Sequence, residues 1–589
     1  MTTTDAQPAS TTVMEQLRRT LPKHGFTGNS SRISHSQVEF IGKLVDDSKV
    51  AEQIDAWRVE DRVKTAPGGR RSVASTRTVL ILFLLLSTEH SALFVKEMAT
   101  IASDRLSGKS LRHLDLWGKR ETGEGWYFPL WRALHRALDA IDPKPGKQWK
   151  FSTPEQYEET LRRRVEANSE VKQARLDWVC NALIEATLQL VPQAARNQWQ
   201  GDLCVDATVV PAYGKRGAPR SKTHVAIESD AGWYRRTSSH KETNDSTKSV
   251  KSVFGWDLTI AVQTNHDPKT LPGYPLLVAG IGFNIPGTAL IHTARHIFES
   301  VAERGHPAGR ATGDRGYHVA ALPEDFQMPL RMLGYTVVTD YLDLQLGLKD
   351  GYAGSIQVEG ALYCPSMPAG LINATVLYRA KDIDAATWRK RIVERRQYML
   401  RPKEKPDAKG RVPMMCPARG PGATVSCPLV ENGCAKVDDA LTTIYNPPVK
   451  PDTICTNATS VSVPFEVGAK LAQHYQYGSN EWQEIYSHDR NTIEGANGFL
   501  KDSSHEAIGD SSRRRVRGST AQYLLVSILV VAGNLRKLQK FRDDMLRPET
   551  DDERAERKAR KLLLRKRRKN RKDKRVAAWD DFQTSPAKT

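Results

Sequence analysis

Leu203-Cys-Val-Asp-Ala-Thr-Val-Val210 is an apolar stretch that contains one acidic residue, Asp206. Its length and its β-branched composition predict a buried β-strand. A second acid, Asp314, ends another short strand-like segment in Ala311-Thr-Gly-Asp-Arg-Gly-Tyr317. Each strand therefore contributes a single carboxylate, which predicts a site that is completed from elsewhere in the chain.

A predicted helix supplies the third acid, in Arg490-Asn-Thr-Ile-Glu-Gly-Ala-Asn-Gly-Phe-Leu-Lys501. Arg490 and Glu494 are four residues apart and share one helix face, and Lys501 lies two turns beyond Glu494. One carboxylate holds a divalent cation poorly. Two strand acids and one helix acid together predict a metal site.

The segments around these acids predict one continuous α/β fold in the order β-β-β-α-β-α-β, with acids on the first and fourth strands. Strands are expected at 203–211, 255–263 and 275–281, in a segment that ends in Asp314, and at 335–339, and helices at 288–304 and 320–333. The segment between Asp340 and Asn480 is rich in Pro, Gly and Cys, with strand-like runs at 375–378 and 460–467. It is interpreted as a domain inserted before the helix of Glu494.

These segments resemble the DDE transposases of bacterial insertion sequences, in the branch whose third motif is Tyr-x2-Arg-x3-Glu-x6-Lys. Arg490, Glu494 and Lys501 fit that motif, whereas Tyr486 stands one place early and Ser487 occupies its position, so no role is transferred to a tyrosine. Asp206 with Ala-Thr after it, and Asp314 with Arg-Gly-Tyr after it, resemble the first two acid motifs. The resemblance covers roughly 200–340 and 480–545, and it implies a ribonuclease-H-like core.

The resemblance also implies a chemistry. Asp206, Asp314 and Glu494 are expected to bind two Mg²⁺ ions, with Asp206 bridging them and Mn²⁺ able to substitute. Three converging carboxylates remain ionised only when cations share their site. Arg490 and Lys501 are expected to hold the DNA backbone. The implied reaction is cleavage at transposon ends followed by strand transfer, with double-stranded DNA (terminal inverted repeats and target) as partner and a homodimer in the synaptic complex.

Composition agrees with a nucleic-acid partner. The 589-residue chain carries a formal net charge of +19, which favours a polyanion. Residues 553–575 hold 14 Lys and Arg against 3 Asp and Glu, a net charge of +11 that leaves +8 for the rest of the chain. This tail is either an electrostatic arm for DNA or a solvated terminus.

The N-terminus lacks the basic and apolar regions of a signal peptide. Two apolar runs, at 79–86 and 523–532, have about half of the ~20 residues that a membrane span needs, and are expected to be buried helices. Seven cysteines, an odd number, argue against a disulfide scaffold. The protein is expected to be cytoplasmic and nucleoid-associated, with no membrane partner.

The predicted organisation has seven parts. They are a flexible N-terminus (1–35), a helical DNA-binding domain (36–142), a linker with helices (143–200), the first part of the core (201–340), the insertion (341–480), the last part of the core (481–546) and a basic tail (547–589). Trp117, Trp126 and Trp131 lie among basic residues of the helical domain. They suit either DNA-end binding or helix packing.

A long connection between the first two strands, 214–253, is basic and contains Trp233-Tyr-Arg-Arg236. It is either a DNA-gripping loop or a solvated one. Tyr317 and His318 either line the DNA path or belong to the core. Other acidic or histidine residues near the motifs lack a matching pattern and are set aside: Asp202, Asp257, His488 and Asp489.

The insertion contains five cysteines, namely Cys364, Cys416, Cys427, Cys434 and Cys455. None forms a Cys-x2-Cys pair, so buried free thiols are favoured over a structural zinc site.

Two other functions compete with transposition. A non-catalytic DNA-binding protein explains the charge but not the acid triad. A metal-dependent nuclease of the same fold explains both, and differs only in whether the freed 3′-hydroxyl attacks a second DNA. A nucleotide-driven machine is disfavoured, because Ser103 stands where the first glycine of a phosphate loop ending at Gly108-Lys-Ser would be.

Overall fold

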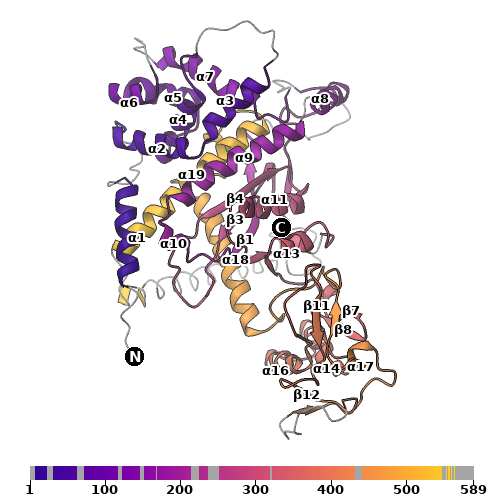
Figure 1. Ribbon diagram of the computed structural model, residues 1–589. Helices are drawn as coiled ribbons and strands as arrows, with labels where there is room; N and C mark the ends of the chain where they lie inside the picture. Colours follow the sequence, from indigo (N-terminus) through magenta and orange to yellow (C-terminus); the bar gives the residue numbers. More distant parts are fainter. Residues whose placement is uncertain are drawn as a thin grey trace, which may run out of the picture.

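The computed structural model describes residues 7–22, 31–62, 72–116, 123–145, 151–166, 169–213, 225–236, 251–318, 321–430 and 441–546, with a few more between 552 and 563. This part of the chain is a mixed α/β structure built on a curled mixed sheet. Helices cover one end of the molecule, and a smaller body formed by the insertion lies at the other end (Figure 1).

The main sheet has six strands: β1 Leu203–Pro211, β2 Gly232–Arg236, β3 Lys251–Gln263, β4 Val278–Asn284, β5 Arg310–Gly313 and β6 Thr336–Val338. The order is β2-β3-β1-β5-β6, and β4 also pairs with β3. β3 runs antiparallel to β1, β2 and β4, whereas β5 is parallel to both β1 and β6. The predicted bounds of β1 are confirmed, and β4 begins three residues later than predicted.

Helix α11 (Leu290–Glu303) lies against β4 because two glycines leave room for it. A Cβ atom at Gly282 would stand 2.2 Å from Cγ2 of Thr293, and one at Gly280 would stand 2.7 Å from Cγ2 of Ile297. Thr293 and Ile297 are one turn apart on the buried face of α11. The expected helix at 320–333 is shorter than predicted. It is limited to α13 (Gln327–Met332), after the four-residue α12 (Arg315–His318), because Pro323 breaks the run.

The N-terminal part of the chain is helical. Its helices are α1 Gln7–Thr20, α2 His35–Asp47, α3 Val50–Glu60, α4 Thr76–Thr88, α5 Val95–Thr100, η1 Ile101–Arg105, α6 Gly108–His113, α7 Gly123–Asp139, α8 Pro154–Glu166, α9 Ser169–Gln189 and α10 Gln193–Arg196. One continuous hydrophobic core joins them to the sheet. The flexible N-terminus expected at 1–35 is partly wrong, because Val13, Leu17 and Leu21 recur every four residues and are buried in that core.

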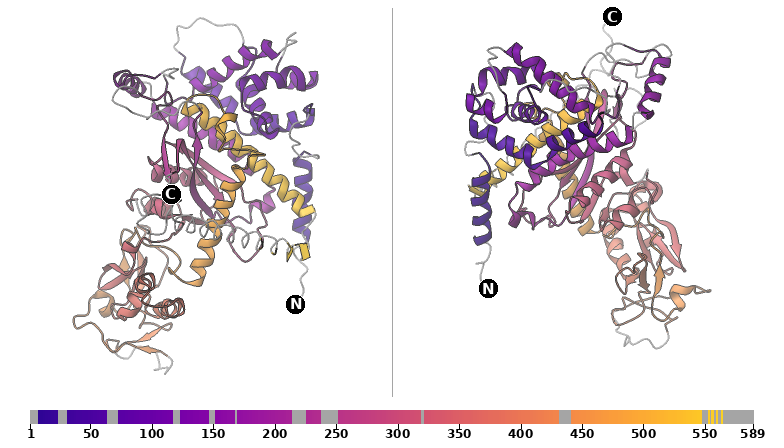
Figure 2. Two further views of the ribbon diagram at one scale, coloured as in Figure 1. Left: turned by 180° about the vertical axis from the view of Figure 1, so that it is seen from behind. Right: turned by 45° about the horizontal axis from the view of Figure 1, so that its top comes forward.

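Helix α19 (Ser519–Leu546) runs beside α9 through the middle of the molecule (Figures 1 and 2). Among the described residues it is the one helix long and apolar enough to cross a membrane, but 89% of its apolar window is buried inside the protein. Helix α4 is buried along nearly its whole length. Both apolar runs are therefore buried helices, as predicted.

The insertion has hydrophobic clusters of its own. Its elements are η2 Asp343–Gln345, β7 Leu348–Tyr352, β8 Ser355–Val358, β9 Ala361–Tyr363, α14 Ala369–Ile372, α15 Ala374–Ala380, α16 Ala385–Arg395, η3 Arg396–Tyr398, β10 Arg401–Pro402, β11 Val412–Met415, β12 Val425–Ser426, β13 Thr442–Thr443, α17 Thr453–Thr456 and β14 Val461–Val463. The strand expected at 375–378 is wrong, because these residues lie in α15. The run at 460–467 gives only β14, which Pro464 ends.

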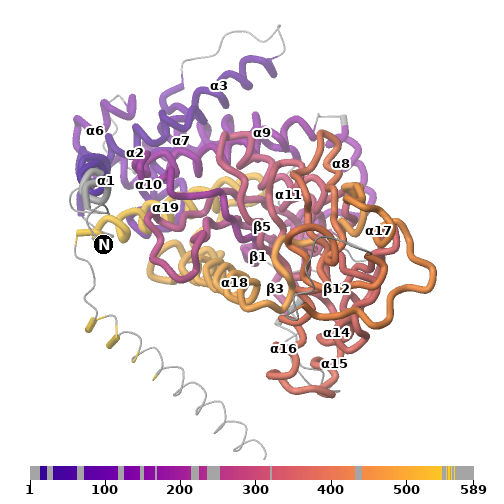
Figure 3. The backbone as a smooth tube through the Cα atoms, turned by 60° about the horizontal axis from the view of Figure 1, so that its bottom comes forward, coloured from indigo at the N-terminus to yellow at the C-terminus, as the bar shows by residue number. Residues whose placement is uncertain are grey.

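Helix α18 (Asn480–Leu500) returns from the insertion to the main sheet, and it lies against β1, β3 and β5 (Figure 3). A short 3-10 turn, η4 (Ser511–Arg513), precedes α19. The chain thus brings a helix from beyond the insertion next to the two strands that carry the lone acids.

Candidate active site

Strand pairing places Asp206 and Asp314 side by side. In the parallel pair of β1 and β5, Val205 is the register partner of Gly313, so the two acids follow the same pair of residues on adjacent strands. The side chain of Asp206 is 20% exposed, and Asp314 is also partly buried. The N–H of Gly316 donates to Oδ1 of Asp314 at 2.8 Å, which orients this carboxylate.

Helix α18 brings the third acid. Ser479 caps the helix by accepting a hydrogen bond from the N–H of Trp482 at 3.1 Å. Trp482, Ile485, Ile493, Ala496 and Leu500 recur at helical spacing and are buried. Glu494 has a 64% exposed side chain, and Arg490, one turn before it, is 18% exposed.

Arg490 lies between a strand acid and the helix acid. Its Nη2 atom is 3.8 Å from Oδ2 of Asp206 and 3.7 Å from Oε1 of Glu494. Both distances are too long for hydrogen bonds and correspond to loose ion pairs. The guanidinium is therefore a cation held between two of the predicted metal ligands.

The electrostatics of the site join all three acids. Burial raises the pKa of Asp206 above its usual value, Arg490 opposes that rise, and the charges of Asp314 and Glu494 add to it. The pKa of Arg490 is raised, because the charges of Asp206 and Asp314 outweigh the effect of burial. The acids thus repel one another across a shared space that contains one guanidinium.

Two buried polar atoms in this space have no hydrogen-bond partner among the described residues, Nη1 of Arg490 and Oδ1 of Asn497. The amide nitrogen of Asn497 donates to Oδ2 of Asp206 at 3.3 Å. Within the same residues, no group of three or more His, Cys, Asp and Glu side chains is arranged to hold a metal ion as it stands. The donor chemistry, three carboxylates and an amide oxygen, nevertheless fits a hard cation such as Mg²⁺.

Asn497 is a candidate site residue that none of the sequence motifs indicates. It lies three residues after Glu494 and seven after Arg490, so helical spacing alone would have placed it on their face. Lys501 forms the exposed C-cap of α18, two turns beyond Glu494. The structure therefore groups Asp206, Asp314, Glu494 and Arg490, and places Lys501 at the end of the same helix.

Tyr486 also lies beside the site, although its position in the motif is shifted by one residue. It is four residues before Arg490 and stacks on Trp482 with ring centroids 5.1 Å apart. Burial raises its pKa, and the charges of Arg490 and Asp314 act on it as well. A tyrosine one place early still reaches this face, because the positions three and four residues before Arg490 both lie on its side of the helix.

Two of the acids without a matching motif have structural partners. Oδ2 of Asp489 accepts a hydrogen bond from Oγ1 of Thr312 at 2.7 Å, and Oδ2 of Asp202 lies 2.7 Å from Nδ1 of His266. Asp202 and Asp489 are both buried, and Arg310 lies 3.4 Å from the first and 3.5 Å from the second. These contacts fasten β5 to β1 and to α18.

Several residues for which the sequence allows either DNA contacts or packing belong to the core. Tyr317 and His318 are 1% and 3% exposed, and burial lowers the pKa of His318 to about 3. Trp126 is also buried. Trp233 packs on Phe254 with ring centroids 5.4 Å apart.

The remaining predictions concern Trp131 and residues outside the described part of the chain. Trp131 is 39% exposed and lies next to His135. Trp117, Cys434, most of the 214–253 connection and nearly all of the basic tail lie outside the described residues. Their predicted roles stay predictions.

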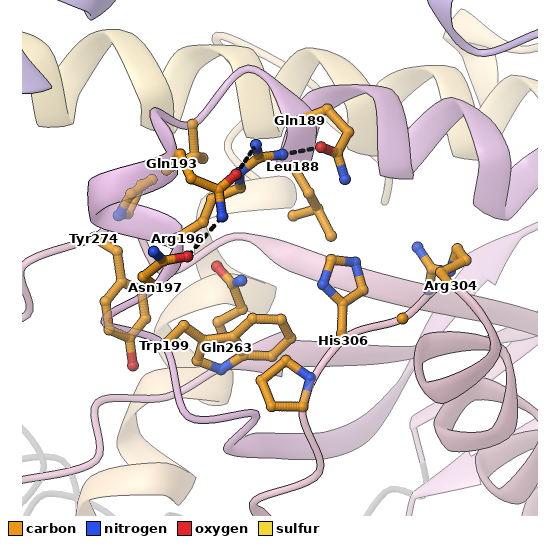
Figure 4. A pocket seen from close by; sticks show the side chains of 14 residues that line it. Leu188, Gln189, Gln193, Arg196, Asn197, Trp199, Gln263, Tyr274, Arg304 and His306 are labelled. Atoms are coloured by element: carbon orange, nitrogen blue, oxygen red, sulfur yellow. Dashed lines mark hydrogen bonds between the residues drawn. The ribbon is translucent and has the colours of Figure 1, made fainter.

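A cavity of about 510 Å³ lies apart from the acids, between the end of α9, α10 and the segment around His306 (Figure 4). Its polar side chains largely bind one another. Arg196 hydrogen-bonds Gln189 and Gln193, and His306 lies 2.8 Å from Oε2 of Glu185. The cavity offers no carboxylate cluster, so the acid site is the stronger candidate for catalysis.

No family model, curated protein or solved structure matches this chain. The geometry of the acid site is therefore the basis for assigning a function.

Proposed function

We propose that the protein is a DNA transposase of the DDE type, which cuts DNA at transposon ends and joins the ends to a target. The observation that carries this proposal is the grouping of Asp206, Asp314 and Glu494 around Arg490. The three acids come from two strands and a helix that are far apart in sequence. Packing does not explain this grouping, because the side chain of Glu494 is largely exposed and contributes little to the core.

The topology supports a ribonuclease-H-like core. The sheet contains the path β4-β3-β1-β5-β6, with β3 antiparallel to its neighbours and β5 and β6 parallel to β1. The acids lie on β1 and directly after β5, and the helix with the third acid packs on the same strands. Apart from the additional strand β2 and the division of the second helix into α12 and α13, the elements follow one another along the chain in the predicted order β-β-β-α-β-α-β.

Asp206, Asp314 and Glu494 would hold two Mg²⁺ ions, with Mn²⁺ able to substitute. When bound, the metal ions would activate the attacking oxygen and stabilise the leaving oxygen at the phosphodiester. Arg490 would bind a phosphate oxygen, because its guanidinium is only loosely paired with Asp206 and Glu494. Lys501, at the end of the helix, would bind the DNA backbone further along.

The proposed partners are the terminal inverted repeats of a transposon and the target DNA. The net charge of +19 favours such a polyanion. Two ends must be joined in one complex, so a homodimer is the working unit. A cytoplasmic, nucleoid-associated location follows from this function.

The test is a cleavage and joining assay on labelled end DNA in Mg²⁺, beside a binding assay in Ca²⁺. Asp206→Asn and Glu494→Gln are expected to lower cleavage and joining by at least about a hundredfold while DNA binding is kept, because a lost ligand removes stabilisation of the transition state. Arg490→Ala is expected to reduce the rate through poorer phosphate positioning. Cleavage at the normal rate by either carboxamide variant would exclude the DDE mechanism.

Matched control variants show whether a loss of activity comes from the missing metal ligand or only from the removal of a negative charge. Asp257→Asn removes a strand acid on the opposite face of the sheet, since Asp257 is the register partner of Val209 and side chains alternate between faces. Glu481→Gln removes an exposed acid from the first turn of α18. Both are expected to cut and join DNA normally. Cleavage without joining in the unaltered protein would instead favour a nuclease of the same fold.

A further inference from the structure

Three cysteines of the insertion begin turns of the same kind. Cys364, Cys416 and Cys427 are each followed by proline. The carbonyl oxygen of each cysteine accepts a hydrogen bond from the N–H three residues later, at 3.1 Å from Met367, 3.1 Å from Arg419 and 3.0 Å from Val430. One motif is therefore repeated three times within the insertion.

In two of these turns a backbone amide faces the sulfur. The N–H of Ser366 bonds the sulfur of Cys364, and the N–H of Ala418 bonds that of Cys416. In both cases the donor lies two residues after the cysteine. Amides in this position stabilise a thiolate, and they also orient a sulfur that binds a metal.

Backbone hydrogen bonds draw the turns together. The N–H of Cys364 donates to the carbonyl of Tyr398 at 2.8 Å, and the chain then passes into β10, whose partner β11 ends directly before Cys416. The N–H of Thr424, near Cys427, donates to the carbonyl of Pro417 at 2.9 Å. The three cysteine turns are therefore close together in the fold, although they are far apart in the sequence.

A fourth cysteine joins the cluster from α17. The guanidinium of Arg419, in the second turn, donates to the carbonyl oxygen of Cys455 at 2.8 Å. Cys364, Cys416 and Cys455 are buried and Cys427 is partly buried, and all four are free thiols. Each of the four lies close enough to the other three for their charges to interact.

We propose that Cys364, Cys416, Cys427 and Cys455 together bind one structural Zn²⁺ ion. Four sulfur ligands in a closed, buried site are the arrangement that structural zinc prefers. As the thiols stand, they are not arranged to hold a metal, so binding requires their side chains to turn toward a common centre. The absence of a Cys-x2-Cys pair does not exclude the site, because the chain assembles it from separated turns.

The site would join two small hydrophobic clusters. Three of the cysteines belong to one cluster and Cys455 to the other. Without metal, burial raises the pKa of Cys364 to about 12 and that of Cys455 to about 11. Zinc would deprotonate these thiols and contribute its binding free energy to the folding of the insertion.

The experiment uses the full chain, purified without added chelator. Metal analysis is expected to find one zinc ion per chain, and Co²⁺ substitution is expected to give the visible spectrum of a tetrahedral four-thiolate site. Serine substitution of any of the four cysteines should weaken metal binding at least about tenfold. Cys180→Ser, a buried cysteine far from the insertion, and Cys434→Ser are the matched controls that should retain the metal.

Two results would overturn the proposal. One is an unaltered protein that contains no zinc and gives no thiolate band with Co²⁺, a result that does not depend on how the variants fold. The other is loss of metal in Cys434→Ser but not in Cys455→Ser. Asp206→Asn should retain the zinc, so this test is independent of the transposase proposal.

Discussion

The acids of the main sheet differ in their partners. Asp202 and Asp489 are buried beside Arg310 and accept hydrogen bonds, so their charges are compensated. Asp206 faces two other acids and one loosely paired arginine, which leaves negative charge uncompensated. A buried acid with satisfied partners serves structure, whereas a group of acids short of positive charge is suited to bind cations.

Asp257 is a buried acid on the face of the sheet opposite to Asp206, and its ionisation affects stability. Its pKa is raised to about 6 by burial, although the N–H of Gly287 opposes the rise. The folded protein therefore holds this proton more tightly than the unfolded chain, and the stabilisation present below about pH 4 is lost as the pH rises through about 6.

Asp257→Asn is thus expected to increase the free energy of unfolding by about 1–2 kcal/mol at pH 7.5, after allowance for partial solvation, and to change it little at pH 4. Urea unfolding at the two pH values measures the difference. An equal change in unfolding free energy at both pH values would show that ionisation of Asp257 is not the cause of the destabilisation.

Among the elements, α18 decides whether the site forms, because it carries two of the four grouped residues. Its register against β5 is set by the bond from Thr312 to Asp489, whose side chains are both inaccessible to solvent. Asp489 directly precedes Arg490, and Thr312 lies two residues before Asp314 on the strand. One buried hydrogen bond thus aligns the helix acid with a strand acid.

Thr312→Val removes this bond and leaves a buried carboxylate with one partner fewer. The variant is expected to lose about 1–3 kcal/mol of unfolding free energy and to cleave DNA more slowly while binding it normally. Thr208→Val is the matched control, since Oγ1 of Thr208 is buried and has no partner among the described residues. Equal losses in both variants, in denaturation and cleavage assays, would show that the bond has no special role.

How far the sequence predicts these elements depends on how local their causes are. β1 was predicted to its ends because an apolar, β-branched run is buried whatever surrounds it. Helix α1 is not predicted, because its composition is largely polar and its few apolar residues are buried only by packing against distant elements such as α10 and α19. The acid triad followed from motif spacing, but the position of Arg490 between two acids depends on the packing of α18, which no local pattern encodes.

At the scale of the whole molecule, charge is distributed unevenly. The body that holds the sheet and the insertion accounts for the smaller part of the net charge, and residues 553–575 contribute +11 of the total +19. Nearly all of this tail lies outside the described residues, so its role is a matter for experiment. Catalysis and general DNA affinity are expected to reside in different parts of the chain.

Deleting residues 553–589 is therefore expected to weaken binding to every DNA sequence and to flatten its salt dependence. Each phosphate contact that is lost lowers the slope of log K against log salt by about 0.9, because fewer counterions are released. A second variant, with the five basic residues at 565–569 changed to glutamine, keeps the length of the tail and should shift the slope in the same direction. Titrations of labelled end DNA and of unrelated DNA at several salt concentrations measure both slopes.

If the tail acts through charge, the two DNAs lose affinity equally and preference for the transposon ends persists, because base contacts come from other parts of the protein. If the slope of log K against log salt is unchanged in the deletion variant, the tail does not contact the DNA backbone.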